Sequence, residues 1–245
     1  ERWLSPVVDG HDANRTRGAK HQHAAVEVVR GRTFRWHARY APDGDTRETL
    51  ARVAGVADGR LPTVPSMPMG DYALLLGSTD PRVQQHVREA CPTAAVVGLD
   101  SMAHWWHARA AALRALLAQV DVLFVDEDEL AQATGDPDAS LAVARVLALG
   151  PAVVVVKRGA RGAWMQRRDG APVATAAAPV REVVDTTGAG DAFTGALLAE
   201  LSRGAPLARA ARFANAAAAL STLGYGAIAP LPRRAAVASA LGPAD

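Results

Sequence analysis

The segment with the clearest chemical signature is Asp185-Thr-Thr-Gly-Ala-Gly-Asp191. It follows a β-branched run at 180–184 and precedes an amphipathic stretch at 191–203, so its glycines stand where a strand turns into a helix. Backbone N–H groups and the positive end of the helix dipole make such a turn an anion site, and glycines let the backbone approach a phosphate. Asp191 is placed to accept the proton of an attacking hydroxyl while those N–H groups stabilise a transferring phosphoryl group.

A plainer interpretation of this segment is that Asp191 only caps a helix and the glycines only form a tight turn. Two better known phosphate motifs are absent. A dinucleotide fingerprint needs glycine at Phe193, and no Gly-x-x-x-x-Gly-Lys-Ser/Thr occurs in the sequence. If the turn binds phosphate, it belongs to a different class of phosphate loop.

Two further residues have types and positions suited to ligand binding. Asp100 follows the predicted strand 94–99, and ligands of open α/β sheets collect beyond the carboxyl ends of strands, so Asp100 is predicted to bind a substrate hydroxyl. Trp36 lies in an early alternating segment, where it either closes over a substrate or fills the buried face of a hairpin.

Strand and helix patterns alternate along most of the chain. The predicted units are 72–76 with 83–90, 94–99 with 105–118, and 122–125 with 127–134. They are followed by a helix at 139–149, strands at 153–157, 163–166, 173–175 and 180–184, and helices at 191–203 and 206–223. This alternation predicts an α/β fold, a three-layer sandwich whose mostly parallel central sheet is covered on both faces.

The region before this alternation is patterned differently. Residues 1–24 show no convincing period and are predicted to be irregular. Alternating residues on either side of Arg30-Gly31-Arg32 predict a β-hairpin with one wet face, the lid-like part of a segment at 25–70. Residues 71–245 then form the predicted α/β core.

Composition limits the classes of function. With 49% hydrophobic residues in 245, the chain has enough apolar surface for a sizeable core. The 27 basic and 25 acidic residues nearly balance without a long cationic run, so no nucleic-acid-binding tract is expected. Apolar runs fall short of a spanning helix, and the single cysteine fits a reducing compartment, so the sequence predicts a soluble, cytoplasmic protein without membrane contact.

The stretch from Val184 to Gly195 closely resembles the C-terminal signature of the ribokinase/PfkB family of sugar and nucleoside kinases. Supporting segments occur in the same order as in the family. These are Val122-Leu-Phe-Val-Asp126-Glu-Asp-Glu129-Leu with Thr134-Gly135, Val154-Val-Val-Lys157-Arg-Gly159-Ala-Arg-Gly162-Ala, Phe213-Ala-Asn215-Ala, and Gly224 to Pro230. The resemblance covers roughly residues 70 to 232 and implies a ribokinase-like fold.

The resemblance also implies roles for individual residues. In the catalytic turn, Asp191 is the expected base, while Gly188, Ala189 and Gly190 supply the anion hole. Asp185 is expected to shape a monovalent-cation site for K⁺. For the nucleotide, the expected ligands are Lys157 at the phosphates, Gly159 and Gly162 in the loop past the ribose or base, and Asn215 beside the adenine. The plainer alternatives are that Lys157 is a solvated lysine at a strand end and that Asn215 is an ordinary buried asparagine.

Asp126 and Glu129 occupy the positions of the Asn-x-x-Glu pair that organises Mg²⁺ and phosphate in this family, mostly through water. Here the first member is Asp, so the chain carries an additional negative charge near the expected triphosphate. Either the metal binds more tightly or the nucleotide binds more weakly, and the sequence leaves both possibilities open.

The expected activity is ATP-dependent phosphoryl transfer to a hydroxyl of a sugar or nucleoside, with a homodimer formed through the lid. The family's opening strand with an acidic residue, and its Gly-Gly pair that grips the sugar, are not found before the hairpin. The alternative is therefore a catalytically silent nucleotide-binding or regulatory protein, or a structural subunit completed by another chain.

Overall fold

The computed structural model describes residues 29–40, 47–65 and 72–242, and they fall into two compact units, one within 1–68 and one within 69–245. Each unit is described by itself. In the first, β1 (Arg35–Tyr40) pairs antiparallel with β2 (Arg47–Val53), with an irregularity between His37 and Ala38. The indole N–H of Trp36 on β1 donates to the Thr49 hydroxyl on β2 at 3.1 Å.

The hairpin in this unit is formed with a strand that was not predicted. The predicted turn was at Arg30–Arg32, before the segment that contains β1, whereas β1 pairs with a strand that follows it in the sequence. The expected first strand, around Val26 and Val28, lies outside the described residues. The second strand was missed because RETLARV carries charges on both sides of a single leucine and has weak alternation.

The second unit contains a six-stranded sheet in the order β3-β4-β5-β6-β7-β8. The strands are β3 (Ala73–Leu76), β4 (Val96–Asp100), β5 (Val122–Asp126), β6 (Val153–Lys157), β7 (Ala163–Arg167) and β8 (Val173–Thr175). The first four are parallel, and β7 and β8 are antiparallel to their neighbours, which confirms the predicted mostly parallel sheet with a meander.

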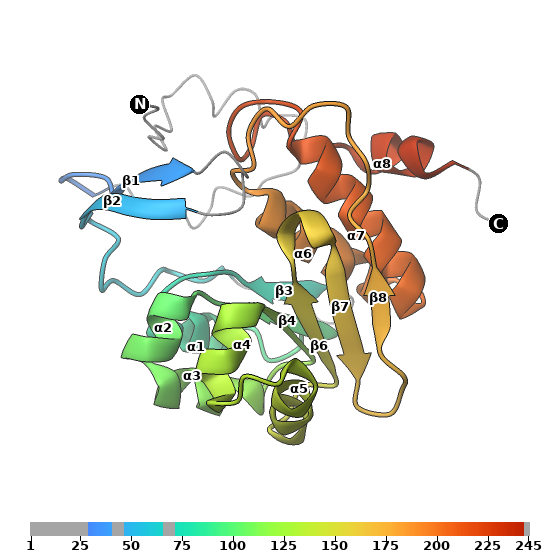
Figure 1. Ribbon diagram of the computed structural model, residues 1–245. Helices are drawn as coiled ribbons and strands as arrows, with labels where there is room; N and C mark the ends of the chain where they lie inside the picture. The colour runs from blue at the N-terminus through green and yellow to red at the C-terminus, as the bar shows by residue number, and fades with distance from the viewer. Residues whose placement is uncertain (1–28, 41–46, 66–71, 243–245) are drawn as a thin grey trace. The chain divides into compact units, whose positions relative to one another are not determined.

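Helices cover both faces of this sheet, as Figure 1 shows. Those on one face are α1 (Pro81–Ala90), α2 (Ala103–Ala108), α3 (Ala110–Leu117), α4 (Glu127–Thr134) and α5 (Ala139–Ala148). On the other face lie α6 (Ala189–Ser202) and α7 (Leu207–Ser221), and α8 (Arg234–Leu241) packs on α7. The arrangement is the three-layer sandwich that the alternation predicted.

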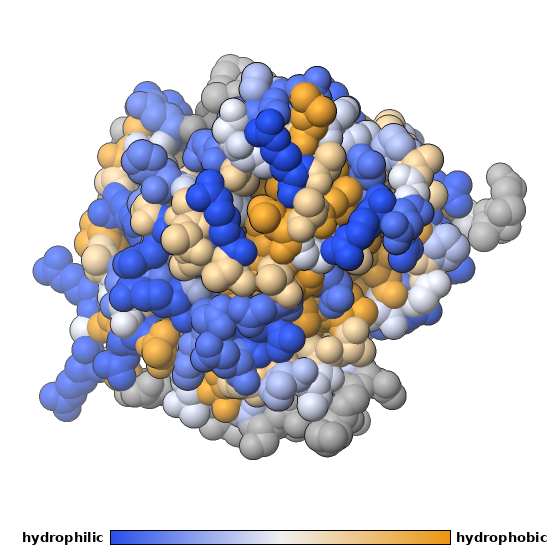
Figure 2. All heavy atoms as spheres, turned by 90° about the horizontal axis from the view of Figure 1, so that it is seen from below, coloured by the Kyte–Doolittle hydropathy of each residue, from blue (hydrophilic) through white to orange (hydrophobic). Residues whose placement is uncertain are grey.

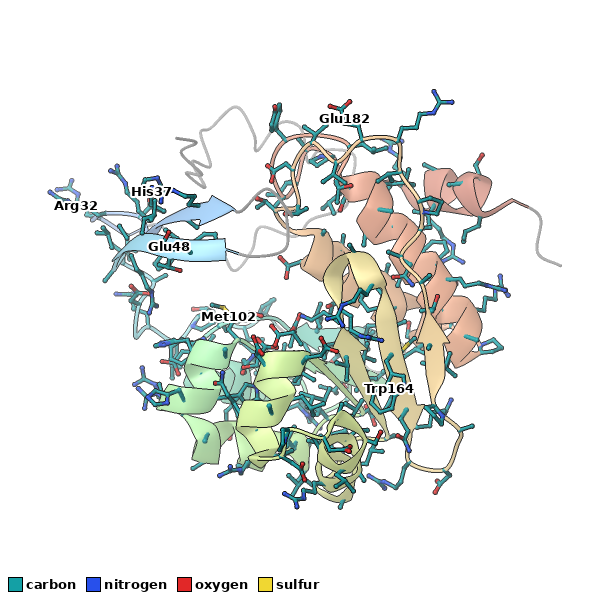
Figure 3. All side chains as sticks on the ribbon, in the orientation of Figure 1. Arg32, His37, Glu48, Met102, Trp164 and Glu182 are labelled. Carbon is teal, nitrogen blue, oxygen red and sulfur yellow. The ribbon has the colours of Figure 1, made fainter. Side chains whose placement is uncertain are left out.

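The two faces hold separate apolar cores because successive side chains of a strand point to opposite sides. Leu123 and Val125 of β5 pack with α2 to α5, whereas Val122 and Phe124 pack with α6 and α7. Trp164 on β7, labelled in Figure 3, joins the first of these clusters. Figure 2 shows mostly hydrophilic side chains on one outer face, with apolar side chains between them.

Two element predictions in this unit are wrong. Residues 180–184 are not a strand: the Val184 N–H donates to the Thr222 carbonyl at 2.8 Å, beside the end of α7. The expected helix 105–118 is two helices that break at Arg109, whose N–H bonds back to Trp105. A β-branched run fits an extended loop as well as a strand, and no proline or glycine marks the break at Arg109.

Candidate active site

The turn before α6 is shaped by Gly188. This residue is the N-cap of α6 and has φ of 78°, in the left-handed region that other residues enter at a cost. A Cβ added there would lie 2.8 Å from the Ala227 Cβ, so space as well as conformation requires glycine. Gly188 therefore fixes both the direction of the helix and its contact with the loop at 224–231.

Asp191 and Gly190 lie in the first turn of α6, where N–H groups have no partner within the helix. The Asp191 side chain is exposed, and a Cβ at Gly190 would meet nothing within 4 Å. The Ala189 N–H, which was also predicted to bind the anion, donates to the Thr186 carbonyl at 3.1 Å in this conformation. The accessible part of the turn is thus centred on Gly190 and Asp191.

Asp185 holds two loops together. One carboxylate oxygen accepts from the Thr187 N–H at 2.9 Å, and the other accepts from the Gly226 N–H at 3.0 Å. The buried Thr187 hydroxyl has no hydrogen-bond partner within the part of the chain that the structure describes. Carboxylate and hydroxyl oxygens suit a hard cation, so this loop pair fits the predicted monovalent-cation site.

The carboxyl ends of β4 and β6 bring Asp100 and Lys157 together. The Lys157 Nζ donates to both Asp100 oxygens, at 2.8 and 3.0 Å, and the Asp100 side chain is only 3% exposed. The Ser101 N–H reaches Asp100 Oδ1 at 3.0 Å, and the Thr194 hydroxyl of α6 lies 3.2 Å from Oδ2. Asp100 was predicted to bind the substrate hydroxyl and Lys157 the phosphates, but the two residues belong to one buried network.

The charge of Lys157 is supported by its surroundings. Burial opposes its charged form, but the Asp100 carboxylate, helped by Glu129 and Asp126, outweighs burial and raises the pKa of Lys157 above its ordinary value. Lys157 and Asp126 are direct neighbours in the register of β5 and β6. The additional negative charge of Asp126 is therefore placed beside a lysine that offsets it.

Asp126 and Glu129 form a capping box at the start of α4. Asp126 Oδ1 accepts from the Glu129 N–H at 2.7 Å, and Glu129 Oε2 accepts from the Asp126 N–H at 2.9 Å. Burial, followed by the charge of Asp126, raises the pKa of Glu129 to about 8. The described part of the chain contains no group of three or more His, Cys, Asp or Glu that could hold a metal ion.

The predicted nucleotide-loop residues have structural partners. Gly162 has φ of 83°, and a Cβ there would lie 2.1 Å from the Thr175 carbonyl oxygen, so close passage of β8 explains the glycine. Gly159, with φ of 54°, begins a 3₁₀ turn, Gly159–Arg161. The buried Asn215 of α7 donates to the Thr175 hydroxyl at 3.1 Å. The adenine and ribose roles of these residues stay predictions.

Sequence reasoning missed Thr194 and Gln84. Thr194 lies one turn after Asp191 on α6, and that spacing was the available signal. Gln84 on α1 is buried and donates through Nε2 to the Gly77 and Asp100 carbonyls, both at 2.8 Å. Trp36 belongs to the other unit, so its predicted substrate contact stays a prediction.

A hollow on the surface of the second unit lies away from these residues. A cavity of about 530 Å³ is lined by side chains of α2, α3 and α4, among them His104, His107 and Arg114. Met102, the N-cap of α2, is labelled in Figure 3. The cavity is on the α1–α5 side of the sheet, whereas Asp191 belongs to α6, so it is separate from the candidate active site.

Comparison with known proteins shows the family of this chain. Residues 70–234 match the pfkB family of carbohydrate kinases, and the chain belongs to that family. It is 39% identical over 127 residues to ribokinase of Arabidopsis thaliana, which covers 50% of this chain and 34% of that protein. It is 36% identical over 122 residues to fructokinase of Vibrio alginolyticus, covering 47% of this chain and 39% of the relative.

A solved structure supports the same assignment. Arabidopsis thaliana ribokinase, complexed with ribose and ATP, superposes with a TM-score of 0.67 at 25% identity and covers 97% of this chain and 80% of that one. The ribokinase-like fold is thereby confirmed. The sequence matches above span only 34% and 39% of the curated relatives' lengths, so the activity and substrates of this chain are matters for proposal.

None of the described helices is both long enough and apolar enough to cross a membrane.

Proposed function

We propose that this protein transfers the γ-phosphoryl group of ATP to a hydroxyl of a sugar or nucleoside. The observation that carries the proposal is the open turn at Gly190 and Asp191, where a helix N-terminus and an exposed carboxylate occupy the same few residues. Membership of the pfkB family supports this reaction class. A turn that served only to close a loop would not need a glycine at position 190, where a Cβ would meet nothing within 4 Å.

In the proposed reaction, Asp191 accepts the proton of the attacking hydroxyl. The hydroxyl oxygen forms a bond to the γ-phosphorus, the bond from that phosphorus to the β–γ bridging oxygen breaks, and ADP leaves. Backbone N–H groups of Gly188 to Asp191, with the positive end of the α6 dipole, stabilise negative charge on the transferring group. In the present conformation the Ala189 N–H donates to the Thr186 carbonyl, so it would have to leave that bond to reach the transferring group.

The remaining site residues are proposed to hold ATP and its cations. Lys157 contacts the phosphates, Gly159 and Gly162 form the loop past the ribose or base, and Asn215 flanks the adenine. Mg²⁺, held through Asp126, Glu129, water and the phosphates, would supply charge neutralisation at the triphosphate. Asp185 and the Thr187 hydroxyl are proposed to bind K⁺.

Three wider expectations belong to the same proposal. Trp36 on the hairpin contacts the acceptor, and the hairpin forms the interface of a homodimer. The protein is expected to act in the cytoplasm, whose reducing conditions suit a chain with Cys91 as its single cysteine.

The test is ATP turnover by the purified chain with Mg²⁺ and K⁺, in the presence and absence of a panel of pentoses, hexoses and nucleosides. The proposal predicts ADP formation that one class of acceptor stimulates. ATP binding without any stimulated turnover would instead favour the alternative of a silent nucleotide-binding protein. Absence of ATP binding would contradict both proposals.

A further inference from the structure

Asp100 was predicted to bind a substrate hydroxyl, but its carboxylate is already surrounded by donors. Lys157 reaches both oxygens, the Ser101 N–H reaches Oδ1, and the Thr194 hydroxyl reaches Oδ2. An ionised carboxylate offers about four lone-pair sites. Lys157 and Ser101 occupy three of these sites, and the single hydroxyl proton of Thr194 can be donated to Oδ2 or to the Gly190 carbonyl. The 3% exposed side chain leaves little surface for a further ligand.

The donors around Asp100 come from the two elements that are proposed to bind phosphate. Lys157 ends β6, and its ammonium has three N–H donors, of which two are directed at Asp100. Thr194 is on α6, three residues after Asp191, and its hydroxyl is also 2.9 Å from the Gly190 carbonyl oxygen. The Asp100 carboxylate thus contacts both Lys157, the proposed phosphate ligand, and the first turns of α6, the proposed anion-binding helix.

Strand geometry explains why these groups meet. Asp100 has the same side-chain direction as Gly98, whose Cβ would contact Leu198 of α6 at 3.0 Å. Lys157 has the same direction as Val155, which packs in the core formed with α6 and α7. Both charged side chains therefore lie on the α6 face of the sheet, at the carboxyl ends of parallel strands.

We infer that Asp100 is a positioning residue, which fixes Lys157 and the first turns of α6 relative to each other so that both can bind the same triphosphate. The inference rests on the proposed nucleotide site and deepens it. It also replaces the predicted contact between Asp100 and the acceptor. The Lys157 side chain is 22% exposed, so its third donor can reach a phosphate while the other two stay on Asp100.

The two roles of Asp100 predict different results for Asp100→Asn. A positioning residue affects MgATP binding when no acceptor is present, whereas an acceptor ligand affects only the acceptor. Loss of a hydrogen bond to a charged group corresponds to about a tenfold change in an equilibrium constant. We expect calorimetric titration of the full chain with MgATP alone to give a Kd about tenfold higher for Asp100→Asn than for the wild type.

Thr194→Val is a second variant. It leaves no buried charge unpaired, because Asp100 keeps its contacts with Lys157 and the Ser101 N–H. We expect it to weaken MgATP binding in the same direction, and Thr194→Ser, which restores the hydroxyl, to recover wild-type binding. Thr134→Val is the matched control. Its hydroxyl donates to the Leu130 carbonyl at 2.9 Å within α4 and has no contact with Asp100.

A ligand-free measurement separates this inference from the proposed function. Amide hydrogen exchange over 189–194 should accelerate in Asp100→Asn and in Thr194→Val, and should be unchanged in Thr134→Val. Wild-type MgATP binding that Asp100→Asn and Thr194→Val leave unaltered would overturn the inference while sparing the proposed function. If the wild type does not bind MgATP, the proposed function fails, and unchanged exchange over 189–194 would overturn the coupling as well.

Discussion

At the scale of single residues, burial strongly perturbs the charge of Glu129 in the candidate site. Its carboxyl is 5% exposed and lies beside Asp126, and its pKa is raised from 4.5 to about 8. A folded-state pKa above the unfolded one means that the folded protein binds the proton more tightly. The stabilisation is fully present below the unfolded pKa and is lost as the pH rises through about 8.

We predict that Glu129→Gln removes this part of the pH dependence. Each pKa unit of difference is worth about 1.4 kcal/mol, so the effect should be large enough to measure. Urea unfolding at pH 5, 7 and 9 should show the free energy of unfolding of the wild type falling relative to that of Glu129→Gln. The exposed Glu89→Gln is the control. A constant difference between Glu129→Gln and the wild type at all three pH values would show that Glu129 titrates normally.

Gly188 offers a second residue-scale test, with a matched glycine elsewhere. Gly188 and Gly204 have φ of 78° and 76°, but a Cβ at Gly204 meets nothing within 4 Å, whereas one at Gly188 meets Ala227 at 2.8 Å. Gly204→Ala should lose about 1 kcal/mol from backbone strain alone. Gly188→Ala should lose more, because strain and overlap add. Thermal unfolding of the two variants measures the difference, and equal losses would mean that Ala227 yields without cost.

At the scale of elements, Gln84 connects α1 to the ends of two strands. Its side-chain amide donates to the carbonyls of Gly77, after β3, and Asp100, at the end of β4. Gln84→Leu keeps most of the volume but leaves the buried Asp100 carbonyl and the more exposed Gly77 carbonyl without this donor. We predict a loss of about 2 kcal/mol or more in the free energy of unfolding. Gln132→Leu, an exposed change on α4, should be nearly neutral, and a similar loss there would attribute the effect to leucine itself.

Much of the element pattern could be predicted because the buried strands carry strong local signals. Val153–Lys157 is almost entirely β-branched, and its strand lies where the sequence placed it. The segment 180–184 also contains three valines but has no strand partner, since pairing is decided by distant parts of the chain. β2 was missed because its pattern is polar on both faces.

The site was predictable in its parts but not in its contacts. A strand-to-helix turn with glycines is a local feature, so Gly188 and the position of Asp191 at the start of α6 could be read from the sequence. The pairing of Asp100 with Lys157 joins residues 57 positions apart through the order of strands in the sheet. From the sequence alone, these two side chains were assigned to separate ligands, because a sequence does not reveal the order of strands in the sheet.

At the scale of the whole molecule, the two compact units predict separable folding. The apolar clusters of the sheet consist of residues from Ala73 onward, all within 69–245. A piece comprising 69–245 should therefore unfold cooperatively, with a midpoint within about 2 °C of that of the main transition of the full chain. Calorimetry of both proteins tests this. A broad, non-cooperative transition of the shorter piece would show that residues 1–68 contribute to the core.

The most direct test of the proposed phosphoryl transfer is the rate of acceptor-stimulated ADP formation by Asp191→Asn. This change removes the proposed base without altering the side-chain volume, and loss of a general base costs about a hundredfold or more. Asp169→Asn is the matched control, because Asp169 is exposed in the turn after β7, next to the amino end of β6. The account predicts a loss of at least that size for Asp191→Asn with MgATP affinity preserved, and near-normal turnover for Asp169→Asn. Near-normal turnover by Asp191→Asn would contradict the proposed mechanism.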